Sequence, residues 1–256
     1  MKAKFDKVSI RASQATTHAY SGSFSLGIRR LAAELRDPVF AVYRFVRLAD
    51  EIVDSFHGFD KSTLLSRFKH ETYLAIDEGI SLNPRLNSFQ RYAREFAIEK
   101  DLFNHFFKSM EMDLSRTKHD HNTFDEYVFG SAQVVGMMCL RVFCKCDTDM
   151  YDSLKVYAMN LASAFQQINF LRDRQSEYLE LGRTYFPEVE MTRFDNASKQ
   201  KIEASNRINF EEGLKGVKKL PRSSRLEVYV AYVFYQGLFK KIMNTPSEMV
   251  LKSRLL

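Results

Sequence analysis

Apolar residues recur every three or four positions along most of this 256-residue chain, and few segments alternate with a period of two. The first spacing places apolar side chains along one side of an α-helix, whereas alternation is typical of half-buried strands. The sequence therefore predicts an all-α protein. The clearest predicted helices span residues 40–55, 64–78, 88–116, 124–144, 151–181 and 225–244.

The composition favours one helical domain over residues 1–256. Hydrophobic residues make up 45% of the chain and charged residues 27%, with only ten Gly and five Pro. A chain of this length can bury a substantial core. We find no linker, no repeat of fixed period and no low-complexity segment, so we expect a single bundle of helices around a central cavity.

The net charge of +6 suits phosphates, an anionic lipid surface or nucleic acid, and the number alone does not choose among them. Residues 195–256 carry twelve Lys or Arg against six Asp or Glu, so we expect this basic end to make peripheral contact with an anionic bilayer. The alternative from a different class is a non-catalytic basic helical protein that binds nucleic acid or another protein. Such a protein would present a continuous positive face.

The cysteines indicate a reducing compartment. Cys139, Cys144 and Cys146 are odd in number and lack the spacing of a disulfide framework or a zinc site. Residues 1–11 have no hydrophobic signal core, and no stretch approaches the roughly 20 apolar residues of a membrane span. We therefore expect a cytoplasmic protein.

A polar stripe lies within the apolar segment 40–55. Tyr43, Arg47, Asp50 and Asp54 follow one another at spacings of four, three and four, which places them on one helical face. The surrounding positions are mostly apolar, so the helix should be largely buried and its carboxylates partly buried with it.

A second stripe repeats this pattern farther along the chain. Gln166, Asn169, Asp173 and Glu177 follow at spacings of three, four and four within another apolar segment. Buried carboxylates are costly unless they are paired or bind metal, so the two stripes suggest a shared polar cavity. Oxygen ligands alone favour Mg²⁺, with Mn²⁺ as the other candidate, over zinc.

The pattern by itself also fits a simpler structure. Two Asp residues at i and i+4 are usually a solvated helix face, Arg47 could be an ion-pair partner of Asp50, and Asn169 could bond between helices. The spacing alone leaves the metal site and these alternatives open.

The residues around the two stripes resemble the squalene and phytoene synthase family. The resemblance is carried by Tyr43, Arg47, Asp50 and Asp54, by Asn169 to Asp173 with Glu177, and by Gly182-Arg183-Thr184-Tyr185-Phe186-Pro187. It extends from about Tyr20 almost to the end and most resembles bacterial phytoene synthases of carotenoid pathways. Shorter matches are Ser21 to Ser25, Met112-Asp113, and Tyr127 with Ala132 to Gly136.

The resemblance implies roles for individual residues. Asp50, Asp54, Asp173 and Glu177 match the acids that bind the Mg²⁺ ions holding the substrate diphosphates, although the family usually has Asp where this chain has Glu177. Arg47, Gln166, Asn169 and Arg172 match polar positions near the diphosphates. Ser21, Ser23 and Phe24 match a flap beside the substrate, Tyr43 belongs to the first motif, and Tyr127 matches a catalytic tyrosine near the reacting centre.

Some of these residues have structural alternatives. Ser21 and Ser23 could cap a helix, and Phe24 and Tyr127 could fill the core. Asp113 matches a family acid, but a supporting role is equally compatible, so it stays outside the metal set. The aromatic residues Phe124, Tyr127, Tyr229, Tyr232 and Tyr235 are candidates for lining a hydrocarbon channel, although such helical stripes are ordinarily core.

The activity implied by the resemblance is a Mg²⁺-dependent prenyltransferase reaction. Two geranylgeranyl diphosphates would join head to head through a cyclopropyl diphosphate intermediate, giving phytoene and free diphosphate. The alternative within the enzyme class is squalene or dehydrosqualene formation from farnesyl diphosphate. The sequence has no Gly-rich dinucleotide motif, so NADPH is not expected, and neither is nucleic acid.

Overall fold

The computed structural model describes residues 2, 4–10, 31–115, 119–181, 186–187 and 194–250, with the backbone alone over 173–181. Within these ranges the chain forms helices and their connections, and it forms no strand. The predicted all-α fold is confirmed. The helices are α3 (Ala33–Asp54), α4 (Lys61–Glu78), α5 (Pro84–Glu95), α6 (Lys100–Ser115), α7 (His121–Val128), the π-helical turn η1 (Phe129–Gln133), α8 (Val134–Cys144), α9 (Thr148–Leu181), α10 (Asn196–Lys219), α11 (Arg222–Met243) and α12 (Ser247–Val250).

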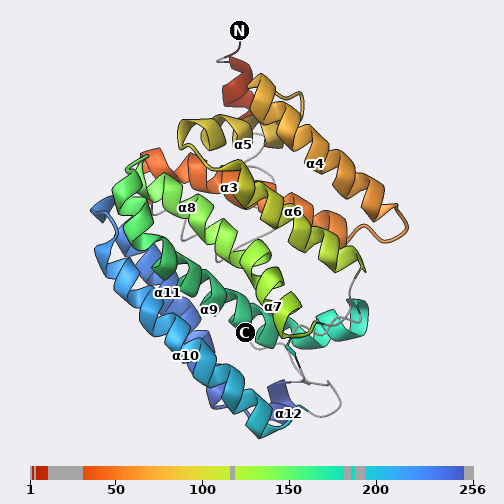
Figure 1. The fold of residues 1–256 in the computed structure, drawn as a ribbon, viewed down its shortest axis with the longest axis vertical. Coiled ribbons are helices and arrows are strands. Elements are labelled where there is room, and N and C mark those ends of the chain that lie inside the picture. The colour runs from red at the N-terminus through yellow and green to blue at the C-terminus, as the bar shows by residue number, and fades with distance from the viewer. Residues whose placement is uncertain are drawn as a thin grey trace.

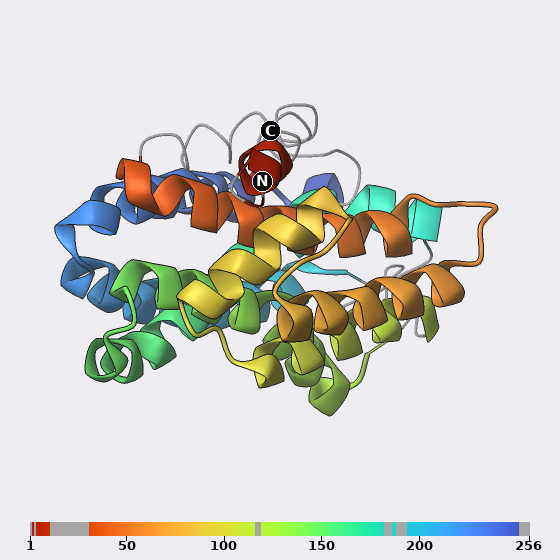
Figure 2. The same ribbon diagram turned by 90° about the horizontal axis from the view of Figure 1, so that it is seen from above.

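The helices form two groups along the long axis of the molecule. Helices α4 and α5 lie near the N-terminus, and α9 to α12 lie toward the other end (Figure 1). Seen from above, the orange α3 runs beside the green α8, against which it packs (Figure 2). Helices α9 and α10 share the most extensive helix–helix contact, and α9 also packs against α8, η1 and α11.

The sequence-based prediction needs two corrections, one to a predicted helix and one for a helix that was missed. The segment 88–116 is not one helix, because the chain turns between α5 and α6, where Ala97 adopts a left-handed φ of 49°. The amide of Ile98 donates to the carbonyl of Ala93 across this turn at 2.8 Å. This turn contains no Gly or Pro, and the apolar residues keep their helical spacing across it, so the sequence predicted one continuous helix. Helix α10 was not among the predicted helices; the side chain of Asp195 caps its start by accepting from the amide of Ser198.

The π-helical turn η1 interrupts the predicted helix 124–144 without ending it. Within this turn, Gly130 lies so close to α6 that a Cβ there would be 2.4 Å from the carbonyl oxygen of His105. In α8, a Cβ on Gly136 would be 2.9 Å from the Cβ of Ala162 in α9. Glycine therefore allows this helix to approach both neighbours closely.

The buried apolar residues form two cores. The first core joins α3, α4, α5, α6, α8 and the beginning of α9, and it is centred on Phe45 and its aromatic neighbours. The second core joins the later part of α9 to α7, α10, α11 and α12, through residues such as Ile168, Phe210 and Phe239. Helix α9 contributes to both cores, so it fixes one relative to the other.

One helical run, His121–Cys144, is long and apolar enough on average to cross a membrane by length and composition alone. This differs from the sequence-based expectation that no stretch approaches such a span. More than half of its most apolar window is buried inside the protein, where it packs against α3, α6 and α9. Those contacts are typical of a core helix. The three cysteines are free in this structure.

Candidate functional site

The polar stripe of α3 lies opposite a tightly packed face of the same helix. Phe45 is fully buried in the first core, whereas Tyr43, Arg47, Asp50 and Asp54 are all half-buried. Arg47 forms an ion pair with Glu51, with 2.9 Å between Nη2 and Oε2. The sequence had offered Asp50 as the ion-pair partner of Arg47, and the structure identifies Glu51 in that position.

Asp50 has the most informative electrostatic environment of the described acids. Its removal from water, followed by the negative charge of Asp54, raises the pKa of the Asp50 carboxyl to about 7, while Arg47 lowers it and Asp113 raises it further. An aspartate of ordinary pKa would be ionised at neutral pH. Burial and the nearby negative charges both disfavour the ionised form of Asp50, and a bound cation would favour it.

Tyr127 and Asp113 link α7 to α6 beside this acidic group. The Tyr127 hydroxyl donates a hydrogen bond to Oδ2 of Asp113 at 3.0 Å, and the Tyr127 side chain is buried. The imidazole ring of His119 lies 5.0 Å from the Tyr127 ring, between centroids. His119 is buried and packs against this tyrosine. Asp113 therefore orients the hydroxyl of Tyr127 and adds negative charge near Asp50.

The second stripe is held by α9. The Tyr235 hydroxyl on α11 donates to Oδ1 of Asn169 at 3.3 Å, and the Tyr235 ring stacks on Phe165 with 4.0 Å between centroids. Gln166 and Arg172 are half-buried on the same helix. Tyr235 thus holds the amide of Asn169 in one orientation, which the sequence did not anticipate.

Several predicted site residues lie outside the described part of the structure. These are Ser21, Ser23 and Phe24, together with the side chains of Asp173 and Glu177, whose backbone belongs to α9. The central cavity that these residues would border stays a prediction. Among the described side chains, no three His, Cys, Asp or Glu residues converge as a complete metal site.

Two of the four predicted metal ligands, Asp50 and Asp54, nevertheless have described side chains, and their chemistry fits that role. Asp50 and Asp54 supply carboxylate oxygens from successive turns of α3, and the pKa of Asp50 is raised by its burial and then by the negative charge of Asp54. Magnesium is commonly held by one or two protein carboxylates together with substrate phosphates and water. The donor set on α3 therefore suits a divalent cation that also binds a diphosphate.

The sequence reasoning missed two polar contacts near the stripes. Glu51 could have been found, because it lies four residues after Arg47 and faces it on the helix. Gln133, in the π-helical turn, donates from Nε2 to the hydroxyl of Ser163 on α9 at 2.8 Å. No sequence signal predicts this second contact, because it depends on how η1 packs against α9.

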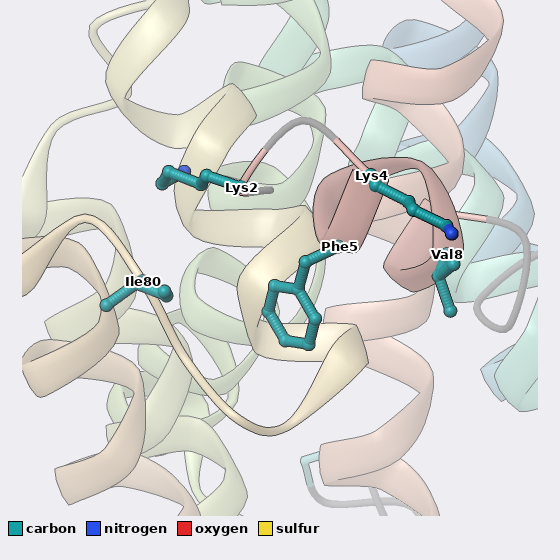
Figure 3. A pocket seen from close by; sticks show the side chains of 5 residues that line it. All are labelled: Lys2, Lys4, Phe5, Val8 and Ile80. Atoms are coloured by element: carbon teal, nitrogen blue, oxygen red, sulfur yellow. The ribbon is translucent and has the colours of Figure 1, made fainter.

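A separate depression lies at the N-terminal helix, residues 4–10. It has a volume of about 530 Å³ and is lined by Lys2, Lys4, Phe5, Val8 and Ile80 (Figure 3). None of the predicted site residues borders it, and its lining is mostly apolar surface. This depression does not belong to the candidate site.

Comparison with known proteins agrees with this arrangement. Phytoene synthase 1 from maize is 28% identical over 253 residues, covering 87% of this chain and 58% of the maize protein. Presqualene diphosphate synthase from Rhodopseudomonas palustris is 29% identical over 171 residues, covering 66% of this chain and 59% of that protein. The chain thus spans somewhat less than two thirds of the length of these curated relatives.

Solved structures show the same helical fold. A squalene synthase from Alicyclobacillus acidocaldarius superposes with a TM-score of 0.81 at 18% identity, covering 98% of this chain and 97% of that one. A dehydrosqualene synthase solved with a ligand superposes with a TM-score of 0.80 at 19% identity, covering 96% and 95%. The sequence pattern of squalene/phytoene synthases matches residues 17–256, which include both polar stripes. The chain therefore belongs to the squalene/phytoene synthase family.

Proposed function

We propose that this protein joins two molecules of geranylgeranyl diphosphate head to head to form phytoene, with release of diphosphate and without NADPH. The observation that carries the proposal is the group of charged residues around Asp50 on α3, which interacts electrostatically with Asp54, with Arg47 and with the Asp113 that holds the Tyr127 hydroxyl. Family membership and the phytoene synthase relatives support the reaction class.

In the first half-reaction, the carbon–oxygen bond to one diphosphate breaks, and the allylic cation is attacked by the double bond of the second substrate. A proton is lost as the cyclopropane ring closes, giving a cyclopropyl diphosphate. Arg47 and Arg172 would bind the departing diphosphate, because guanidinium groups donate in pairs to phosphate oxygens. The Arg47–Glu51 ion pair would hold the Arg47 guanidinium in place for this contact.

In the second half-reaction, the cyclopropyl diphosphate loses its diphosphate, rearranges and loses a proton to give phytoene. Tyr127 is proposed to lie beside the reacting carbons. Its proton is directed to Oδ2 of Asp113, so the lone pairs of its oxygen remain available to stabilise positive charge. The buried aromatic surroundings of Tyr127, including Phe170 at 6.0 Å between ring centroids, would exclude water that could capture a cation.

Asp50, Asp54, Asp173 and Glu177 are proposed to hold Mg²⁺, or Mn²⁺ in its place. When bound, the metal would supply Lewis-acid assistance to the departing diphosphate. The two described acids keep their carboxylates on one side of α3, and Arg47 on the same side partly offsets their charge.

Squalene or dehydrosqualene formation from farnesyl diphosphate is the second candidate. It is favoured by the presqualene diphosphate synthase among the relatives and by the squalene and dehydrosqualene synthases among the structural neighbours. Chain length depends on channel depth rather than on the acids, so the polar stripes fit both substrates equally.

The deciding experiment supplies the purified protein with labelled farnesyl or geranylgeranyl diphosphate and Mg²⁺, with and without NADPH. We expect geranylgeranyl diphosphate to give phytoene in either case, and EDTA to stop the reaction. A hydrocarbon formed from farnesyl diphosphate alone would support the second candidate. If neither substrate is consumed while nucleic acid is bound in a salt-sensitive and EDTA-insensitive way, the non-catalytic alternative is correct.

A further inference from the structure

Helix α11 has two apolar faces, and within the part of the chain that the structure describes only one of them is packed. Tyr232, Phe239 and Ile242 are buried against the second core, as expected for a helix at the edge of a bundle. The opposite face carries five further large apolar side chains, all of them exposed. They are Leu226 (64% exposed), Tyr229 (45%), Val230 (38%), Val233 (48%) and Phe234 (48%).

These five residues, here called the outer stripe, form a continuous line. Their spacings of three, one, three and one place them on one side of the helix over more than two turns. Gly237 continues the line, and a Cβ there would meet nothing within 4 Å. Isolated exposed apolar residues need no explanation, but a contiguous stripe indicates a surface that binds another molecule or a membrane.

Basic residues stand at both ends of the outer stripe. Arg222 and Arg225 are exposed at its beginning, and Lys240 and Lys241 are exposed at its end. The only acidic residue of α11, Glu227, is half-buried on the flank. Arg222 and Lys240 are about 27 Å apart along the axis at the ordinary rise of an α-helix. The stripe is therefore apolar in the middle and cationic at both ends.

We propose that the outer stripe of α11 docks this protein on an anionic lipid bilayer, with the helix axis parallel to the membrane surface. An interfacial helix sinks its apolar side into the boundary between headgroups and acyl chains while its lysines and arginines reach the lipid phosphates. Cations at both ends match this orientation, because a helix inserted by one end would bury one pair of charges.

Charge and size favour a bilayer over a second copy of the chain. Five side chains on one helix are few beside the roughly 20–30 residues that each partner contributes to a standard protein interface. Two copies meeting through this face would also bring their basic ends into proximity, whereas anionic lipid neutralises them. The inference does not depend on which reaction the protein catalyses.

The test measures binding of the full chain to vesicles of phosphatidylcholine and phosphatidylglycerol in equal parts, by flotation. We expect binding to these vesicles and much weaker binding to pure phosphatidylcholine. The double variant Leu226→Ser/Phe234→Ser should bind at least about ten-fold more weakly, because two apolar side chains no longer enter the lipid. Arg222→Gln/Lys240→Gln should lose roughly ten-fold or more on the anionic vesicles only.

The matched control carries the same two substitutions elsewhere. Leu82 and Phe59 are 90% and 71% exposed in the connections on either side of α4, so Leu82→Ser/Phe59→Ser removes the same side chains from another surface. This control should bind vesicles as the parent does. Equal binding of all variants, or equal loss in the control, would overturn the proposal. The proposal would also be overturned if the parent bound no vesicles and instead formed a concentration-dependent dimer that the Leu226→Ser/Phe234→Ser variant did not form.

Discussion

The two sides of helix α3 differ sharply: one is packed with aromatic rings, and the other carries charged groups. On one side Phe45 is fully buried among five other phenylalanine rings, stacked on Phe89 with 4.0 Å between centroids. On the other side Asp50 is half-buried, and burial together with the neighbouring acids opposes its ionisation. The first side stabilises the fold as it stands, whereas the second would become favourable with the cation and diphosphate that we propose to bind there. Substitutions on the two sides of this helix should therefore have different consequences.

The largest expected effect follows removal of a carboxylate from the polar side. Asp50→Ala should lower turnover by at least about 10³-fold, because the diphosphate would lose part of its charge stabilisation. Helical circular dichroism should be unchanged. Glu34→Ala is the control on the same helix, since Glu34 pairs with Lys145 at the surface. Parent-like turnover in Asp50→Ala would remove this acid from the mechanism.

Truncation on the packed side should act on stability instead. Phe45→Ala should lower the free energy of unfolding by about 3–5 kcal/mol, because it leaves a cavity between aromatic rings. Phe59→Ala, at a 71% exposed position, should change it by no more than about 0.5 kcal/mol. Denaturant unfolding measures both. If the two variants proved equally stable, the aromatic cluster would not be the main packing centre of α3.

The raised pKa of Asp50 predicts a pH dependence that the packed side lacks. The folded protein holds a proton on Asp50 that the unfolded chain releases near its ordinary pKa, so the stabilisation is present in acid and is lost as pH rises through about 7. In metal-free buffer above that pH, Asp50→Asn should be more stable than the parent by about 1–3 kcal/mol. Thermal melting across this range tests the prediction, and parallel curves for parent and variant would contradict it.

The smallest expected effect concerns the pair that faces this side. Tyr127→Phe and Asp113→Ala should each lower kcat by roughly ten-fold, because each breaks the hydrogen bond that orients the tyrosine hydroxyl. The double variant should lose little more than either single variant, since both act through one contact. Independent, multiplying losses would show that Asp113 and Tyr127 act separately.

Local periodicity made much of α3 predictable. The stripe of Tyr43, Arg47, Asp50 and Asp54 follows from spacings of three and four, and the buried positions between them follow from their apolar character. The same rule could have identified Glu51 as the partner of Arg47. These features depend on residues within one or two helical turns, so the sequence contains the information directly.

Contacts between helices were not predictable in the same way. The bond between Tyr127 and Asp113 joins α7 to α6, and the bond between Tyr235 and Asn169 joins α11 to α9. Both depend on crossing geometry that periodicity does not specify. The turn at Ala97 was missed for a related reason, because tertiary packing imposes a left-handed residue where no glycine signals it.

The π-helical turn η1 has a consequence for how the chain tolerates deletions. It contains one residue more than regular α-helical winding would need between α7 and α8. Deleting that residue would allow uninterrupted α-helical winding, and the residues after the turn would keep their rotational phase, so Gly136 would still face Ala162. A deletion in the regular part of the helix between η1 and Gly136 would instead rotate everything after it by about 100° and turn Gly136 away from α9. The helix can therefore lose one residue at η1 without changing how α8 packs on α9.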